Sequence, residues 1–388
     1  MDTRTIGRDL EMLKLQDLYG DVVDDVSPRV FTIIGDAGVG KSRLPRELDQ
    51  WLAEIPDPVW WFRGRASPSA QNLPNALLRE MMAARLDIHE SDDPETVRLK
   101  WEEGMATMFG AGSEGRAHLV AHWLGFEIGD TPHVRGVRHD PQGLHDRARS
   151  YLTEYFADLV GESPVVVLLE DLHWADEGSL RWFDSAGHLL AGRVVLVVAT
   201  KRPSLFERYP TWGESGDVHT RIPLDSLSRR QSRQLLGEIL QKAEHVPEAL
   251  IELVVDATDG NPFYIEELVK WMLEAGVIEK DDDRWTVHEQ KIDRTRVPAT
   301  LRGVLQARLD TLAHDERQAL QQAAVIGRVF WDDAVEGSCR RDGSEQSAGG
   351  DVARSAPLTR GRLRTAAVDL RRHEGVPLQA RLAARRDL

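Results

Sequence analysis

The chain of 388 residues has one cysteine, Cys339. A single cysteine excludes both an intramolecular disulfide and a cysteine-based metal cluster. No apolar run reaches the roughly 18 residues that a membrane-spanning helix needs. The first residues, Met1–Arg4, lack the basic and then apolar pattern of a secretory signal peptide. These absences predict a protein of the reducing cytoplasm that has no membrane partner.

Clustered positive charge is scarce as well, since the formal net charge is −15 at pH 7. Nonspecific binding of nucleic acids or anionic membranes requires clustered lysine and arginine. We therefore expect no nucleic-acid binding through this segment. The content of 41% hydrophobic and 29% charged residues is that of a globular protein. The length leaves room for roughly two or three domains.

Residues 338–388 differ in composition from the rest of the chain. They contain 11 arginines, six acidic residues and no lysine, so this tail carries +5 and residues 1–337 carry −20. The tail also lacks aromatic residues and shows no period of 3.6 or 2. We therefore predict that it is disordered.

The most informative segment follows the apolar run Val30–Ile34, which is typical of a buried strand. It has the pattern Gly-x4-Gly-Lys-Ser, a loop whose backbone N–H groups cradle phosphates. Lysine then supplies a charge for the β- and γ-phosphates, and serine a magnesium ligand. The predicted nucleotide-binding residues are Gly35, Asp36, Ala37, Gly38, Val39, Gly40, Lys41 and Ser42.

Strand-like runs alternate with helical patterns along the first 225 residues, which predicts an α/β fold with a mostly parallel, five-stranded sheet. Residues 66–160 are too long for a single crossover and are predicted to form a helical insert, with amphipathic segments at Leu77–Leu86, Thr96–Phe109 and Leu144–Leu159. The predicted strands are Val30–Ile34, Val59–Phe62, Val165–Leu169, Val194–Ala199 and Ile222–Leu224.

Two acidic residues, Glu170 and Asp171, follow the third predicted strand, at the edge where parallel sheets bind ligands. Glu170 is expected to hold magnesium through water, and Asp171 to orient or deprotonate the attacking water. The assignment of these two roles stays open, and one of the pair could instead cap the next helix. His173 is interpreted as structural, because no metal partner or nucleophile is spaced for it.

The fourth predicted strand ends at the same edge with Thr200 and Arg202. Thr200 could respond to the γ-phosphate and Arg202 could contact it, so that ATP and ADP would be distinguished. An arginine at a strand end is also an ordinary surface residue, and both interpretations stay open.

After Asp225 the pattern becomes helical. Ser228 is predicted to cap a first helix, and a second spans Pro247–Ala257. Asn261 is expected to cap a third helix, with Pro262 at its first position. A hairpin is predicted from 277–279 and 284–287, and two further helices from 300–312 and 315–326.

Together these motifs resemble the signal-transduction ATPases with numerous domains, a P-loop branch related to the AAA+ and origin-recognition ATPases. The chain is similar in particular to the ATPase module of bacterial LuxR-type regulators and of proteins associated with class III adenylate or guanylate cyclases. The matching segments are Ile6–Asp9, Gly35–Ser42, Leu169–Asp176, Ala199–Pro203 and Gly260–Leu268.

The resemblance implies an ATPase core over 1–225, a helical lid over 226–276 and a partial winged-helix region over 277–337. It also implies that Arg8 and Pro262 border the base and that Arg202 senses the γ-phosphate. Pro45 departs from the family, which usually has an apolar residue there. A proline at this position removes an N–H and is expected to kink the helix behind the phosphate site.

The resemblance ends near Glu336. Codons compatible with Asp369–Ala380, shifted by one base, can spell a sequence like the one that the family carries beyond its winged helix. We therefore interpret 338–388 as out-of-frame sequence after a frame change near Gly337. An intact family-like continuation in the second frame of the coding DNA would support this, and its absence would contradict it.

The resemblance implies an ATP-dependent signalling switch with slow, magnesium-dependent hydrolysis. The chain would be a fragment of a larger transcriptional regulator or cyclase-associated protein. Its expected ligands are ATP, ADP and Mg²⁺, and its expected partners are a protein or effector domain and, under nucleotide control, a second copy. The alternatives are a motor ATPase or kinase, an origin-recognition-like DNA-binding ATPase, and an inactive truncated product.

Overall fold

The structure is a computed structural model that describes residues 5–137, 139–160, 163–214, 218–280, 284–292, 300, 303 and 304. The chain forms two compact units, Met1–Glu266 and Glu267–Leu388. No helix among the described residues is long and apolar enough to cross a membrane.

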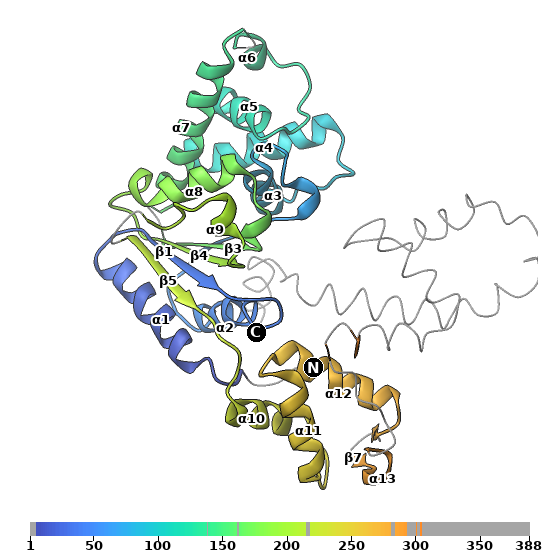
Figure 1. The fold of residues 1–388 in the computed structure, drawn as a ribbon. Helices are drawn as coiled ribbons and strands as arrows, with labels where there is room; N and C mark the ends of the chain where they lie inside the picture. The colour runs from blue at the N-terminus through green and yellow to red at the C-terminus, as the bar shows by residue number, and fades with distance from the viewer. Residues whose placement is uncertain are drawn as a thin grey trace, which may run out of the picture. The chain divides into compact units, whose positions relative to one another are not determined.

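A five-stranded, fully parallel sheet lies at the centre of the first unit (Figure 1). Its order, β2-β3-β4-β1-β5, confirms the predicted sheet. Each strand lies at or near a predicted run, but β2 extends through the polar residues Arg63 to Arg65, which pair with Leu168 to Glu170 of β3. The strands are β1 (Arg29–Ile34), β2 (Trp60–Arg65), β3 (Val165–Glu170), β4 (Val195–Lys201) and β5 (His219–Pro223).

The central strands β3 and β4 are buried along their full length. Alternate side chains pack against opposite layers of helices, so the strands are apolar on both faces. Phe31 and Ile33 face α1 (Asp9–Asp24) and α2 (Arg43–Leu52). Val30 faces the opposite layer, which includes α3 (Ala76–Arg85) and α8 (Glu177–Leu189).

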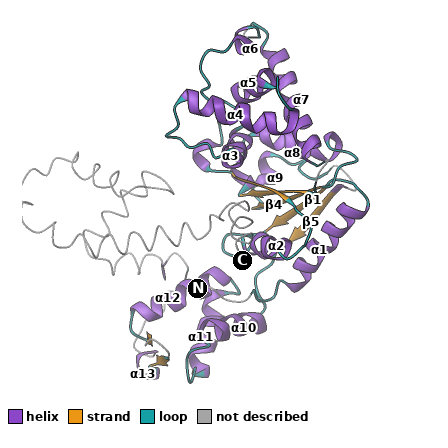
Figure 2. Cartoon of the chain, turned by 180° about the vertical axis from the view of Figure 1, so that it is seen from behind, coloured by secondary structure: helices purple, strands orange, loops and turns teal. Residues whose placement is uncertain are grey.

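The segment between β2 and β3 is built of helices, as Figure 2 shows from behind. Three of the helices correspond to the predicted amphipathic segments, and α5 and α6 were not predicted. The buried side chains of Trp101 and Tyr155 lie at the centre of the packing between these helices. The helices are α3, α4 (Pro94–Phe109), α5 (Glu114–Trp123), α6 (Pro132–Arg135) and α7 (Pro141–Leu159), after the short 3₁₀ helix η1 (Pro68–Ala70).

Two helices follow β5 in the first unit, α10 (Arg229–Ile239) and α11 (Glu248–Thr258). Ser228 forms the predicted cap of α10 in a reciprocal capping box with Gln231. Arginines of α10 pair with acidic residues of α11, and the pairs are Arg229 with Glu252 and Asp256, and Arg233 with Glu248 and Glu252.

The boundary between the units falls within α12 (Pro262–Glu274). The second unit then has the antiparallel hairpin of β6 (Ile278–Lys280) and β7 (Trp285–Val287), followed by α13 (Glu289–Ile292). The strand pairing agrees with the predicted hairpin. The predicted helices 300–312 and 315–326 and the tail 338–388 lie outside the described residues, apart from Thr300, Gly303 and Val304.

Pro45 lies at the third position of α2, within its first turn. The first four N–H groups of a helix have no partner within the helix. The proline therefore removes no hydrogen bond of α2, and a kink in this helix stays a prediction.

Candidate phosphate site

The carboxyl ends of β1, β3 and β4 lie at one edge of the sheet, because the three strands are parallel neighbours. In the sheet, β4, β3 and β2 lie on one side of β1, and β5 lies on its other side. The chain runs from β1 to β2 at the far edge and later crosses to β5. Such a reversal of strand order opens a crevice where parallel sheets bind ligands. The loop Gly35–Ser42 follows β1 directly and therefore begins at this crevice.

The loop uses glycine at two left-handed positions, Gly38 with a φ of +84° and Gly40 with a φ of +97°. Four consecutive carbonyls on its other side accept hydrogen bonds. Because N–H and C=O point in opposite directions across a trans peptide bond, the N–H groups of residues 37–40 face away from these partners. The acceptors and donors are Asp36 with Lys41 Nζ (2.6 Å), Ala37 with Asn261 Nδ2 (3.0 Å), Gly38 with the N–H of Phe263 (3.2 Å) and Val39 with Arg8 Nη2 (2.8 Å).

Arg8 connects the loop with the chain after β5. The same Nη2 group that donates to Val39 also donates to the carbonyl of Asp225 at 2.7 Å. The side chain is buried, and this burial lowers the pKa of Arg8, while Glu11 and Asp225 oppose the shift. The predicted role of Arg8 at the base remains a prediction, whereas its contacts show that it holds two segments of the first unit together.

Asn261 makes two contacts, of which only one was predicted. Its Oδ1 accepts the N–H of Tyr264 at 3.2 Å, as expected of a helix cap. Its Nδ2 binds the loop carbonyl of Ala37. A Cβ at Gly38 would lie 2.5 Å from Asn261 Oδ1, so glycine is required there for the close approach as well as for its backbone angle.

Lys41 is buried and bonded to the carbonyl of Asp36, five residues earlier in the same loop. Burial lowers the pKa of Lys41, and the nearby Arg202 lowers it further, while Asp171 and Asp36 raise it. Arg202 is exposed at the end of β4, and its charge reaches Lys41. The structure therefore brings together Lys41, Asp171 and Arg202, which lie far apart in the sequence.

Arginines from β2 bind both acidic residues at the end of β3. Arg63 Nη2 lies 2.9 Å from Glu170 Oε2. Arg65 donates to Asp171 Oδ2 through Nε at 3.1 Å and Nη2 at 3.0 Å. Asp171 adopts a left-handed backbone with a φ of +57°. Its N–H donates to the buried hydroxyl of Thr200 at 3.2 Å, so the acidic pair and the end of β4 are directly linked.

Sequence reasoning missed Arg63 and Arg65. Their alternation places both side chains on one face of β2, but the pattern alone does not show that β2 pairs with β3. It also missed the role of Asp176, which is buried at the start of α8. Its carboxylate accepts three backbone N–H groups, those of Asn75 (2.9 Å), Leu77 (3.1 Å) and Ser179 (2.9 Å).

The oxygen donors here suit magnesium. The Ser42 hydroxyl and the Glu170 carboxylate are hard oxygen ligands, and Mg²⁺ commonly takes only one or two such groups from the protein, together with phosphate oxygens and water. Among the residues that the structure describes, no group of three or more histidine, cysteine or acidic side chains forms a complete protein metal site. The residues present therefore fit a metal that arrives with a nucleotide.

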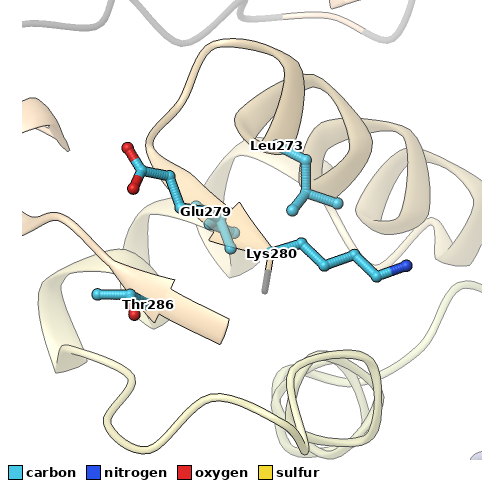
Figure 3. A pocket seen from close by; sticks show the side chains of 5 residues that line it. Leu273, Glu279, Lys280 and Thr286 are labelled. Atoms are coloured by element: carbon cyan, nitrogen blue, oxygen red, sulfur yellow. The ribbon is translucent and has the colours of Figure 1, made fainter. Parts of the chain in front are cut away.

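A separate pocket of about 630 Å³ lies in the second unit beside the β6-β7 hairpin (Figure 3). It shares no residue with the phosphate site. Its lining side chains are Leu273, Ile278, Glu279, Lys280 and Thr286.

The parallel sheet, its strand order and the Gly-x4-Gly-Lys-Ser loop after β1 define the class of P-loop nucleoside triphosphatases. The chain belongs to the AAA ATPase domain family, which it matches over residues 4–198. It thus contains an ATP-binding ATPase module. Residues 228–286 match a domain of unknown function, DUF8739.

Three further proteins are similar to this chain. An uncharacterised protein of Rhizobium meliloti (strain 1021) is 26% identical over 343 residues, which are 83% of this chain and 29% of that protein. The chain thus spans less than a third of that relative. The ORC1 protein of Aeropyrum pernix, solved in complex with DNA, has a TM-score of 0.44, with 11% identity and coverage of 94% of this chain and 84% of that one. Drosophila ORC bound to DNA has a TM-score of 0.39, with 15% identity and coverage of 94% and 80%.

Proposed function

We propose that the chain is a nucleotide-dependent regulatory switch, in which ATP binding and slow hydrolysis change the attachment of the lid to the ATPase core. In this proposal the core is 1–225, the lid 226–276 and the partial winged-helix region 277–337. The module would serve a larger regulator, such as a LuxR-type or cyclase-associated protein. A protein partner, an effector domain or nucleotide-controlled self-association would read its state.

One observation carries this proposal: the turn before α12 is hydrogen-bonded directly to the phosphate loop. Asn261 and the N–H of Phe263 bind the carbonyls of Ala37 and Gly38. A phosphate held by the N–H groups of this loop would fix the peptide groups to which the lid is attached. Nucleotide state and lid position would therefore be coupled through the loop backbone.

The site residues would divide the chemistry among them. The loop N–H groups and Lys41 would hold the phosphates, and Ser42 and Glu170 would hold magnesium, whose bound charge would stabilise the transferring phosphoryl group. Asp171, fixed by Arg65, would orient the attacking water. Thr200 and Arg202 would respond to the terminal phosphate, and Arg8 and Pro262 would border the base.

Nucleotide binding and phosphate release test the ATPase function. The full chain and Lys41→Ala are purified in parallel, and bound adenine nucleotide and magnesium-dependent phosphate release are measured. We expect bound ATP or ADP and slow turnover in the wild type and the loss of both in Lys41→Ala. A folded wild type that binds no nucleotide would contradict the proposal, and aggregation of both proteins would favour an inactive truncated product.

Distance measurement tests the switch itself. In a Cys339→Ser background, spin labels are placed at two exposed positions, Asp57 in the core and Gln241 in the lid. Pulsed electron paramagnetic resonance then measures the distance between the two labels with ATP and with ADP. We expect two different distance distributions and a smaller difference in Asn261→Ala. Asn72→Ala, which changes an exposed asparagine in the segment before α3, is the matched control. Identical distributions with both nucleotides would contradict a switch.

The same protein separates this proposal from an origin-recognition-like DNA-binding ATPase. Duplex DNA binding is measured at several salt concentrations. Affinity that falls steeply with salt would indicate phosphate contacts and favour the DNA-binding alternative. We expect no such binding, because residues 1–337 carry a formal charge of −20.

A further inference from the structure

A buried histidine that the proposed chemistry leaves unused lies beside the phosphate site. His173 belongs to the 3₁₀ helix η2 (Leu172–Trp174), two residues after Asp171. Only 5% of it is exposed, and neither ring nitrogen has a hydrogen-bond partner among the residues that the structure describes. A neutral imidazole has one N–H donor and one acceptor, and a buried polar group without a partner costs free energy.

The ring is held in place through its backbone and its neighbour. Arg208 of α9 (Leu205–Arg208) donates to the carbonyls of His173 and Ala175, each at 2.8 Å. The imidazole also packs against the Trp174 ring, with 5.1 Å between the ring centroids. These contacts hold the residue in place and engage neither ring nitrogen.

Three of the four charged groups that affect the ring belong to the phosphate site, and the fourth is Arg208. Arg202, Asp171, Lys41 and Arg208 lie close enough for their charges to affect its protonation. Burial is the largest cause and lowers the pKa of His173 to about 4, so the imidazole is neutral at pH 7. It is therefore an uncharged potential donor among the groups proposed to hold the terminal phosphates.

We propose that the His173 ring N–H donates a hydrogen bond to the terminal phosphate of the bound nucleoside triphosphate. This inference deepens the proposed function and rests on it. It adds a contact that a diphosphate would lack, so His173 would help the site to distinguish ATP from ADP. Its buried nitrogen would gain the partner that it lacks within the chain.

Another buried histidine provides a matched control. His219 on β5 also has two ring nitrogens without a hydrogen-bond partner among the described residues, and its side chain is fully buried. The charged neighbours that affect it are Asp184, Arg221 and His188, none of which belongs to the phosphate site. The same substitution at the two positions therefore separates loss of a buried imidazole from loss of a phosphate contact.

The test measures affinities of the full chain for ATPγS and ADP with magnesium. The variants are His173→Phe, which removes the donor, His173→Gln, which keeps an N–H, and His219→Phe. A hydrogen bond to a charged group predicts that His173→Phe weakens ATPγS binding about ten- to a hundredfold and ADP binding less than about twofold. We expect partial recovery in His173→Gln and an unchanged ATPγS to ADP ratio in His219→Phe.

If His173→Phe weakens the binding of ATPγS and ADP equally, or weakens neither, the inference is overturned. A wild type that binds no nucleotide would instead overturn the proposed function itself. A second measurement needs no variant. Histidine C2 hydrogen exchange in the wild type, followed by mass spectrometry, is expected to slow at His173 more with ATPγS than with ADP. Equal exchange rates with the two nucleotides would also overturn the inference.

Discussion

At the scale of single residues, buried polar side chains link segments that are distant in the sequence. Asp176 binds backbone N–H groups at the starts of both α3 and α8. Because its carboxylate is buried, water cannot replace these bonds in the folded protein. Asp176 therefore has a structural role in joining α3 to α8. Asp171, five residues earlier, lies at the phosphate site.

Replacing Asp176 by alanine is expected to lower the free energy of unfolding by about 2–4 kcal/mol, because three backbone donors lose a charged acceptor. Denaturant titration measures the change. Asp146→Ala is the control, since Asp146 is exposed on α7, and it is expected to shift stability by less than about 0.5 kcal/mol. Equal effects of the two substitutions would contradict the structural role.

His173 also predicts a dependence of stability on pH. Its pKa is about 4 in the folded chain and about 6.5 when unfolded, so the unfolded chain binds more protons between these values. The contribution of His173 to the free energy of unfolding is complete above pH 6.5 and is lost as the pH falls towards 4. The loss amounts to at most about 3 kcal/mol.

The check is the unfolding free energy of the wild type and His173→Gln, measured without nucleotide at pH 7.5 and pH 4.5. The difference between the two proteins isolates His173 from other titrating groups. We expect the wild type to lose more stability than the variant over this interval. Parallel losses would show that His173 is not held neutral in the folded chain.

At the scale of elements, β2 supplies the contacts that position the acidic end of β3. Arg65 holds Asp171 through two N–H groups on one oxygen. Arg65→Ala would free this carboxylate to take other rotamers. Because misplacement of a group that orients water slows the chemical step, we expect phosphate release to fall about tenfold while ATP affinity changes less than about twofold.

Steady-state hydrolysis and equilibrium binding, measured on the same preparations, check this prediction. Arg181→Ala is the control, because Arg181 is exposed on α8 and pairs with Glu177 of the same helix. Unchanged hydrolysis in Arg65→Ala would show that Asp171 does not depend on this contact.

The elements differ in how far the sequence determines them. The apolar runs of β1, β3 and β4 and the glycine spacing of the phosphate loop are local patterns, and they predicted the sheet and the loop. The links from Arg65 to Asp171 and from Asn261 to Ala37 depend on which segments become neighbours. Spacing along the chain does not contain that information, so the polar contacts around the loop appear only in the structure.

At the scale of the whole molecule, ligand binding and stability are linked through the first unit, which contains all of the predicted site residues. A ligand that binds only the folded state stabilises it by about 2.7 kcal/mol at a hundred times its Kd. For a unit of this size we expect Mg-ATP to raise the midpoint of thermal unfolding by about 5–10 °C.

Differential scanning calorimetry of the full chain measures this shift. The transition of the first unit should move with Mg-ATP, and Lys41→Ala should show no shift at the same ligand concentration. An equal shift in Lys41→Ala would place the stabilising ligand elsewhere in the protein.

The four bonded carbonyls of the phosphate loop have one further consequence. Each belongs to a peptide group whose N–H points to the opposite side, and an anion on that side polarises the group towards its oxygen. The bonds from Asn261, Phe263 and Arg8 to these oxygens would therefore strengthen as negative charge accumulates on the ligand. The lid would thus respond to the number of phosphate charges through induction across single peptide groups, without contacting the phosphates.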